Sequence, residues 1–177
     1  MSGTPGNGGG VRRLLSCLGV VVVVLAVLAG GVVWLLRDEL FHPFGDARAC
    51  VGSDAKLPGV ISAGGAPIPA GASDIHYLTR NGRAEVAFVS GRIPDYLDRA
   101  GILPEDKPLF DRKYGEKVDD GIARPDDLCG TPLREPLWLY HSTTDDGADV
   151  SVLVERSPTV NDALRFPARA VITYNFP

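Results

Sequence analysis

The sequence predicts an α+β domain with a mostly antiparallel sheet and a short covering helix, preceded by an N-terminal transmembrane helix. Three observations lead to this fold class. The 23-residue run Leu14–Leu36 holds no charged residue. The dipeptide Asn81-Gly82 separates two strand-like segments, which is a strong hairpin signal. The last part of the chain is also strand-rich, and 168–176 alternates apolar and polar residues.

The uncharged run determines the predicted organisation. At a rise of about 1.5 Å per residue, a helix of this length covers the roughly 30 Å hydrocarbon core of a bilayer. Arg12 and Arg13 precede the run and all 22 acidic residues follow position 37, so we expect a cytoplasmic N-terminus. The predicted parts are a cytoplasmic tail at 1–13, a transmembrane helix at 14–36, a Gly/Ala/Pro-rich tether at 37–72 and an extracytoplasmic α+β domain at 73–177.

Cleavage of the run is the alternative. Val27-Leu28-Ala29 has small residues where a signal peptidase reads them, and cleavage near Ala29 would give a secreted protein. It would also leave the apolar segment 30–36 exposed to water, which is unfavourable. We therefore expect a single-pass protein of the cell membrane, with the lipid bilayer as the partner of Leu14–Leu36.

The part of the chain after position 37 is acidic. It holds 15 of the 18 Lys and Arg residues and all 22 acids, which gives a formal net charge of −7. Repulsion from phosphate groups argues against nucleic acid or an anionic lipid surface as its partner. With about 140 residues, this part is long enough for one domain with its own core.

Two of the three cysteines, Cys50 and Cys129, lie outside the apolar run. In an oxidising compartment such a pair predicts a disulfide. The bond would close a loop of about 80 residues and, on the chain-entropy model, stabilise the domain by about 4 kcal/mol. The alternative is a catalytic or metal-binding thiol, but no His/Cys cluster at ligand spacing accompanies either residue. The third cysteine, Cys17, is expected to be an apolar membrane residue.

The segments 74–80 and 83–90 are predicted to pair through the Asn81-Gly82 turn, because both central positions of a type I′ turn require positive φ. A two-residue loop sets the register and puts the apolar side chains on one face. The expected pairs are Ile75 with Phe88, Tyr77 with Val86 and Thr79 with Ala84.

A short helix is predicted next, because Pro94 lies near its start and Gly101 at its end. Tyr96, Leu97 and Ala100 form its expected buried stripe. The lead-in from Pro69 into Asp74-Ile75-His76-Tyr77, with the hairpin and this helix, resembles small membrane-anchored or secreted proteins of high-GC Gram-positive bacteria. The resemblance covers Pro69–Gly101. It implies a location and a style of fold, and it carries over no catalytic residue.

Residues 102–136 are predicted to form a long irregular segment, because they combine 15 charged residues with five prolines. Such a segment is uncommon in a compact domain, and ordered long loops often carry function. We therefore take it as the candidate interaction loop, with these residues as its expected contacts: Asp111, Arg112, Lys113, Tyr114, Asp119 and Asp120.

The segments 137–142 and 149–155 flank a second turn, Asp145-Asp146-Gly147. A two- or four-residue loop would pair Leu139 and His141 with the valine-rich face of 149–155. A three- or five-residue loop would pair Trp138 and Tyr140 with it instead. We expect the second register, which buries the aromatic rings and leaves His141 outward, although the sequence alone leaves both registers open.

No set of residues predicts a catalytic or metal centre. His42 is expected near the membrane interface and His76 on the polar face of the first hairpin. His141, Ser142 and Asp145 are too close in sequence to form a hydrolase triad. The aspartate pairs at 119–120, 126–127 and 145–146 lack calcium-loop spacing and suit turns. We therefore expect no cofactor, no metal and no enzymatic activity.

The predicted function follows from the anchor, the stapled domain and the interaction loop. We expect a single-pass membrane protein whose extracytoplasmic domain binds an envelope protein. The alternative is an envelope enzyme of the hydrolase type, or a small-ligand-binding domain, in which His76 or His141 meets a carboxylate in a pocket. Nothing in the sequence indicates an oligomeric state.

Overall fold

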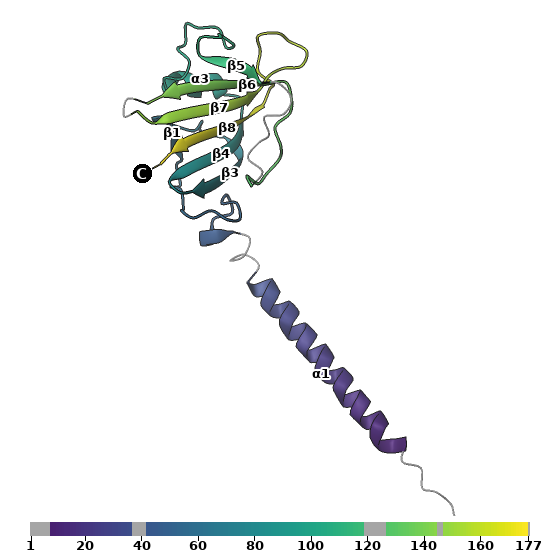
Figure 1. Ribbon diagram of the computed structural model, residues 1–177. Helices are drawn as coiled ribbons and strands as arrows, with labels where there is room; N and C mark the ends of the chain where they lie inside the picture. The colour runs from purple at the N-terminus through teal and green to yellow at the C-terminus, as the bar shows by residue number, and fades with distance from the viewer. Residues whose placement is uncertain (1–7, 37–41, 119–126, 145–146, 177) are drawn as a thin grey trace, which may run out of the picture. The chain divides into compact units, whose positions relative to one another are not determined.

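The computed structural model describes residues 8–36, 42–118, 127–144 and 147–176 (Figure 1). The chain divides into two compact units, Met1–Leu40 and Phe41–Pro177. The first unit contains the helix α1 (Gly8–Leu35). Among the residues whose side chains the structure describes, no helical stretch combines the length and apolar character needed to cross a membrane.

The second unit is an α+β fold with an antiparallel sheet, as predicted. Six strands lie in the order β3-β4-β8-β7-β6-β5, and every neighbouring pair is antiparallel (Figure 1). Their bounds are β3 (Ser73–Arg80), β4 (Arg83–Ser90), β5 (Gly115–Val118), β6 (Leu137–Thr143), β7 (Asp149–Glu155) and β8 (Ala168–Asn175). The remaining elements are η1 (Pro43–Gly45), β1 (Ser62–Ala63), β2 (Ala66–Pro67) and α3 (Ile93–Arg99).

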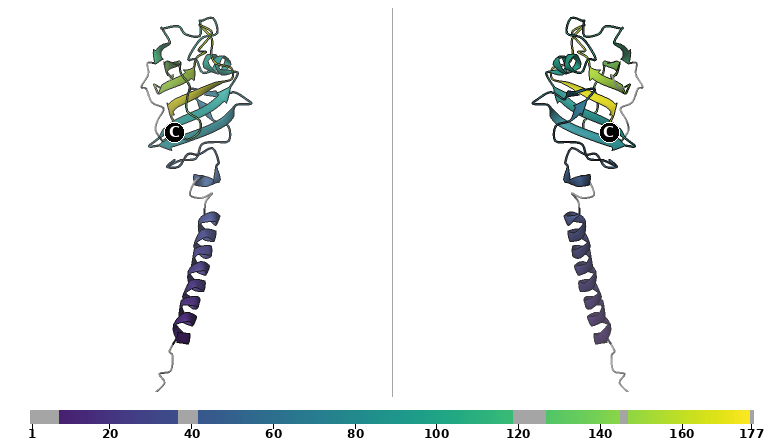
Figure 2. Two further views of the ribbon diagram at one scale, coloured as in Figure 1. Left: turned by 90° about the vertical axis from the view of Figure 1, so that its right-hand side faces the viewer. Right: turned by 90° about the vertical axis from the view of Figure 1, so that its left-hand side faces the viewer.

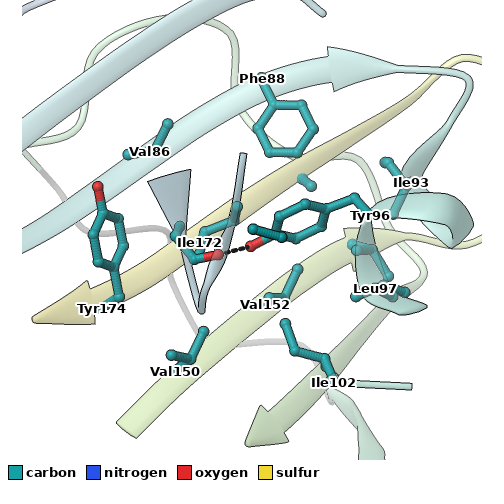
Figure 3. Close-up of a cluster of buried hydrophobic side chains, with 14 of the residues drawn as sticks. Val86, Phe88, Ile93, Tyr96, Leu97, Ile102, Val150, Val152, Ile172 and Tyr174 are labelled. Atoms are coloured by element: carbon teal, nitrogen blue, oxygen red, sulfur yellow. Dashed lines mark hydrogen bonds between the residues drawn. The ribbon is translucent and has the colours of Figure 1, made fainter. Parts of the chain in front are cut away.

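One face of the sheet carries the larger core, and α3 packs against this face (Figure 2). The predicted helix stripe is confirmed for Tyr96 and Leu97, which are fully buried, and Ile93 joins them. Figure 3 shows these side chains meeting Val152 and Ile172 from the central strands. The Tyr96 hydroxyl donates a hydrogen bond of 3.0 Å to the carbonyl of Ala63, which ties α3 to the short β1–β2 hairpin.

The opposite face carries a second, smaller core, because the strands place further apolar side chains there: Leu78, Ala87, Leu137, Leu153 and Val171. Loop residues cover them, chiefly Leu128 and the two cysteines. The predicted disulfide between Cys50 and Cys129 is present, with 5.4 Å between the Cα atoms. It joins the segment before the sheet to the segment that covers this face.

The segment 37–72 was expected to be an extended tether, but much of it belongs to the domain. Leu57 and Ile61 are buried in the larger core, and Ala49 forms an isolated parallel bridge to Tyr77 on β3. The Tyr77 hydroxyl also donates to Asp46, at 3.1 Å. Apolar residues spaced among Gly and Pro therefore pack without regular secondary structure, a pattern with no helical or strand period to detect.

The first predicted hairpin is present as β3–β4, and its register is confirmed from Arg80 back to His76. The pairs Tyr77 with Val86 and Thr79 with Ala84 are as expected. The predicted pair of Ile75 and Phe88 is wrong, because the register shifts between Ser73 and His76. Asp74 lies inside this bulge with φ +50°, a conformation that Asp tolerates better than most residues.

The later strands agree with the preferred register, and the long loop is more ordered than predicted. In the β6–β7 hairpin Trp138 pairs with Val154 and Tyr140 with Val152, while His141 points away from the core and is exposed. The segment 102–136 contains the strand β5, which pairs with β6 at the edge of the sheet. This strand was missed because only its last residue, Val118, is buried.

Candidate functional site

The described part of the candidate interaction loop converges with His141 at one edge of the sheet. Arg112 and Lys113 are exposed, Tyr114 is half-buried, and together with Glu116 and His141 they line a shallow cavity of about 240 Å³. We call this group of five residues the β5-edge surface. Both the loop and His141 were candidates from the sequence, and the structure brings them together.

Backbone contacts hold this surface in place. The Asp111 side chain accepts a hydrogen bond from the Lys113 N–H at 2.8 Å, and the Tyr114 N–H bonds to the Asp111 carbonyl at 3.0 Å, which makes a tight turn. The His141 N–H then donates to the Tyr114 carbonyl at 3.2 Å. Asp111 is therefore a turn residue; the side chains of Arg112 and Lys113 that follow it face solvent, while Tyr114 packs against the edge of the larger core.

Gly115 sets how closely β5 approaches β6. A Cβ atom at this position would lie 2.4 Å from the Leu139 carbonyl oxygen and 2.5 Å from Trp138 Nε1. Any other residue would therefore push the strand, and Tyr114 and Glu116 with it, away from His141. The other two predicted loop contacts, Asp119 and Asp120, lie outside the described residues.

The charges of the β5-edge surface are mixed. His141 Nε2 lies 3.6 Å from a Glu116 carboxylate oxygen, and both side chains are more than half exposed. The Lys113 ammonium lies 5.2 Å from the centre of the Tyr114 ring, within cation–π range. Two cations, one carboxylate and one imidazole thus lie around a half-buried aromatic ring. Of these residues, Arg and Tyr belong to the types enriched in protein interfaces.

His141 also lines a larger open cavity of about 660 Å³ over one end of the strands β6, β7 and β8. The strand register explains it, because His141, Ser151 and Thr173 are paired across β6, β7 and β8. The floor of the cavity is therefore polar, with further contributions from these residues: Arg83, Asp149 and Asn175. Hydroxyl, amide and charged groups of this kind suit a polar ligand.

His76 lies elsewhere, in a half-buried cluster beside the disulfide. Its Nε2 atom is 2.8 Å from Asp74 Oδ1, and its Nδ1 atom is 3.7 Å from Cys129 Sγ. Asp74 also forms a 2.8 Å ion pair with Arg169. The hydrogen bond from Arg169, followed by that from His76, holds the pKa of Asp74 below its usual value. We expected His76 to be solvated, but it belongs to a network of polar contacts with Asp74, which lies in the bulge of β3.

A buried carboxylate, Glu155, is the main polar feature that the sequence did not reveal. Its side chain is fully buried and accepts three hydrogen bonds of 2.8 to 3.1 Å from Arg134, one from the backbone and two from the guanidinium. Arg165 lies 3.7 Å away. Burial alone would raise the pKa of Glu155, but the hydrogen bonds from Arg134 outweigh it and leave this pKa lowered. Glu155 thus fixes the loop before β6 to the end of β7.

Neither histidine forms a hydrolytic triad within the described residues. His141 has a carboxylate partner and lines cavities, but no nucleophile is hydrogen-bonded to it there. His76 has a carboxylate and a sulfur, but that sulfur is in the disulfide. The structure's described part also contains no group of three or more residues that would hold a metal ion.

The comparisons with known proteins give no family. No protein-family model, no curated protein and no solved structure matches the chain.

Proposed function

We propose that the protein is a membrane-anchored binding module whose extracytoplasmic domain recognises an envelope protein through the β5-edge surface. The uncharged run Leu14–Leu36 behind Arg12 and Arg13 supports the anchor and its orientation. The disulfide between Cys50 and Cys129 is consistent with an oxidising compartment.

The observation that carries this proposal is the clustering of Arg112, Lys113 and Tyr114 with Glu116 and His141. Arg112 and Lys113 are exposed and contribute nothing to the core, whereas the turn at Asp111 fixes the backbone beneath them. A rigid backbone lowers the entropy lost on binding, so the side chains act as preorganised contacts. The cationic side chains on an otherwise acidic domain favour a partner with an acidic patch.

Crosslinking in intact cells followed by mass spectrometry tests the proposal. We expect the wild-type chain to crosslink to an envelope protein, and the double variant Arg112→Ala/Tyr114→Ala to lose that product. The control is Lys56→Ala/Val60→Ala, which changes exposed residues on the segment beside β3, at the opposite edge of the sheet. Equal crosslinking by both variants would contradict the assignment of the surface, and addition of an external protease to whole cells tests the orientation separately.

A second candidate function is the binding of a small polar ligand in the cavity of about 660 Å³. Its support is the polar row of His141, Ser151 and Thr173 across three strands. Substitution of Ser151 by alanine and of Thr173 by valine removes both hydroxyl groups with little change in the shape of the row. Native mass spectrometry of the chain purified from cells tests this candidate: a bound small molecule that is lost from this variant and retained in Arg112→Ala/Tyr114→Ala would favour the polar cavity, and an unliganded wild-type chain would contradict it.

A further inference from the structure

The side chains around the disulfide are arranged as in a proton relay. Asp74, His76 and Cys129 lie in this order, with 2.8 Å from carboxylate to imidazole and 3.7 Å from imidazole to sulfur. An imidazole held by a carboxylate can exchange a proton with a neighbouring thiol or thiolate. A disulfide that only staples two segments needs no such neighbour.

The two sulfur atoms of the bond are not equivalent. Cys50 is 1% exposed, whereas Cys129 is partly exposed. The Cys129 N–H donates a hydrogen bond of 2.9 Å to Cys50 Sγ. An incoming thiolate therefore reaches Cys129 more easily, and the backbone N–H can stabilise negative charge on Cys50 as the leaving sulfur.

The His76 ring packs closely against the loop segment that carries Cys129. Gly130 has φ +90°, and a Cβ atom there would lie 2.5 Å from His76 Cδ2. On the other side, Asp74 is fixed by Arg169 at 2.8 Å. Among the residues that the structure describes, the charged and titratable groups that face the imidazole are thus the Asp74 carboxylate on its own strand, the Arg169 guanidinium behind it on β8 and the sulfur of Cys129.

We propose that Cys50 and Cys129 form a thiol–disulfide exchange centre whose reaction partner is a pair of neighbouring thiols on another envelope protein, with His76 as its acid–base group and Asp74 as a positioning residue. This centre is separate from the β5-edge surface, and it does not depend on the function proposed for that surface.

The exchange proceeds in two steps. One thiol of the partner gives its proton to His76 and attacks Cys129 Sγ; the Cys50–Cys129 bond breaks, and its electron pair goes to Cys50 Sγ, which takes the proton of the partner's second thiol. The second thiol of the partner attacks the partner's own sulfur in the mixed disulfide and releases Cys129 as a thiolate, which takes a proton from His76. The partner's two thiols are oxidised to a disulfide, and Cys50 and Cys129 are reduced to two thiols.

The reverse direction sets the expected magnitude. If His76 lowers the pKa of the released Cys129 thiol by about one unit, its thiolate fraction near neutral pH rises about tenfold. Nucleophilicity falls by about threefold for the same change, because the Brønsted coefficient is about 0.5. The net gain in exchange rate is therefore about threefold, before any contribution from proton transfer.

The rate of reduction of the full-length chain by dithiothreitol tests the proposal. The chain is kept folded in detergent micelles near neutral pH, and free thiols are counted by maleimide labelling and mass spectrometry. We expect His76→Asn to slow this reduction, and to slow by about threefold the reoxidation of the reduced chain by oxidised glutathione, in which Cys129 is the attacking thiolate. His42→Asn, which changes a histidine outside this cluster and outside the β5-edge surface, should leave both rates unchanged. Reduction only after the domain unfolds, or equal rates in wild type and His76→Asn, would overturn the proposal.

A second measurement examines the thiol itself. In the variant Cys50→Ala, the rate of alkylation of Cys129 by iodoacetamide is followed against pH; its labelling site is identified by mass spectrometry, since Cys17 is also present. We expect the rate to titrate below the ordinary thiol value of about 8.5, and to return to it when His76→Asn is added. Asp74→Asn should give an intermediate midpoint. Titration at about 8.5 in all three variants would overturn the role of His76. If Cys50→Ala does not fold, the reduction assay still tests the proposal, because it uses the chain with both native cysteines.

Discussion

The hydroxyl of Thr79 tests how the segment before β1 is attached to the sheet. The side chain is fully buried, and its Oγ1 atom donates to the Ala55 carbonyl at 2.6 Å and accepts from the Ala55 N–H at 2.9 Å. Thr79→Val removes both hydrogen bonds and keeps the shape of the side chain. Each lost bond is worth about 1 kcal/mol, and more where the partner stays buried. Because Ala55 is only half-buried, we expect a loss of about 2–3 kcal/mol in the free energy of unfolding.

Urea unfolding of the full-length chain measures this loss. Trp138 is buried in the domain, so its fluorescence reports unfolding in a Trp34→Phe background, which removes the tryptophan of α1. For a slope of about 1–3 kcal/mol/M, the midpoint should fall by roughly 0.7–3 M. Thr79→Ser is the matched control, since it keeps the hydroxyl and loses a methyl group worth about 1 kcal/mol. A Thr79→Val variant no less stable than Thr79→Ser would refute the reasoning.

Three further predictions concern charge, packing and backbone. The lowered pKa of Glu155 means that its contribution to stability is present above about pH 4.5 and is lost as the pH falls through its lower folded-state pKa; Glu155→Gln should therefore flatten the dependence of the urea midpoint on pH in acid. Leu97→Ala in α3 should cost about 2–5 kcal/mol in the same urea assay, because Leu97 is fully buried, and a cost under 1 kcal/mol would contradict its place in the core. Gly130→Ala should destabilise the domain by about 1–3 kcal/mol, because φ is +90° there and the new methyl group would collide with His76. Adding His76→Ala removes the collision but not the backbone strain, so the double variant should recover only part of the lost stability in a thermal melt.

The strand registers were predictable where turn residues and the apolar faces of neighbouring segments determine them. The Asn81-Gly82 turn determined the pairing of β3 and β4 over five residues of β3, since the turn sets the register and the apolar face agrees with it. The choice of register for β6 and β7 was also right, because only one of the two alternatives buries Trp138 and Tyr140. The predicted register was wrong at Ile75, because a bulge interrupts β3 there and the sequence has no turn motif that would indicate it.

The rest depends on contacts that are distant in sequence. The strand β5 has four residues, and it is a strand because β6 offers an edge beside it, not because its own sequence alternates. Leu57 and Ile61 pack through tertiary contacts and have no periodic neighbours. The same reason hid the cluster around Glu155, whose partner Arg134 lies 21 residues earlier in the chain.

The candidate sites show a similar division. Composition predicted the Asp111–Tyr114 part of the loop as a surface, because Arg, Lys and Tyr in an irregular segment have little to bury. It did not predict that His141 would lie beside that surface, since this depends on the pairing of β5 with β6. Nor did it join His76 to Cys129, because 53 residues separate them and only the fold brings them within 3.7 Å.

The disulfide has a mechanical consequence for a chain held at one end. A pull along the polypeptide that enters at Cys50 passes directly to Cys129, because the covalent bond is shorter than the 79-residue path between them. The β3–β4 hairpin, α3 and β5 all lie within that interval, so tension cannot straighten them. Beyond Cys50, the chain that can be drawn out while the bond is intact is the part after Cys129, with β6, β7 and β8, so the bond removes 79 residues from the length that the domain can yield under force.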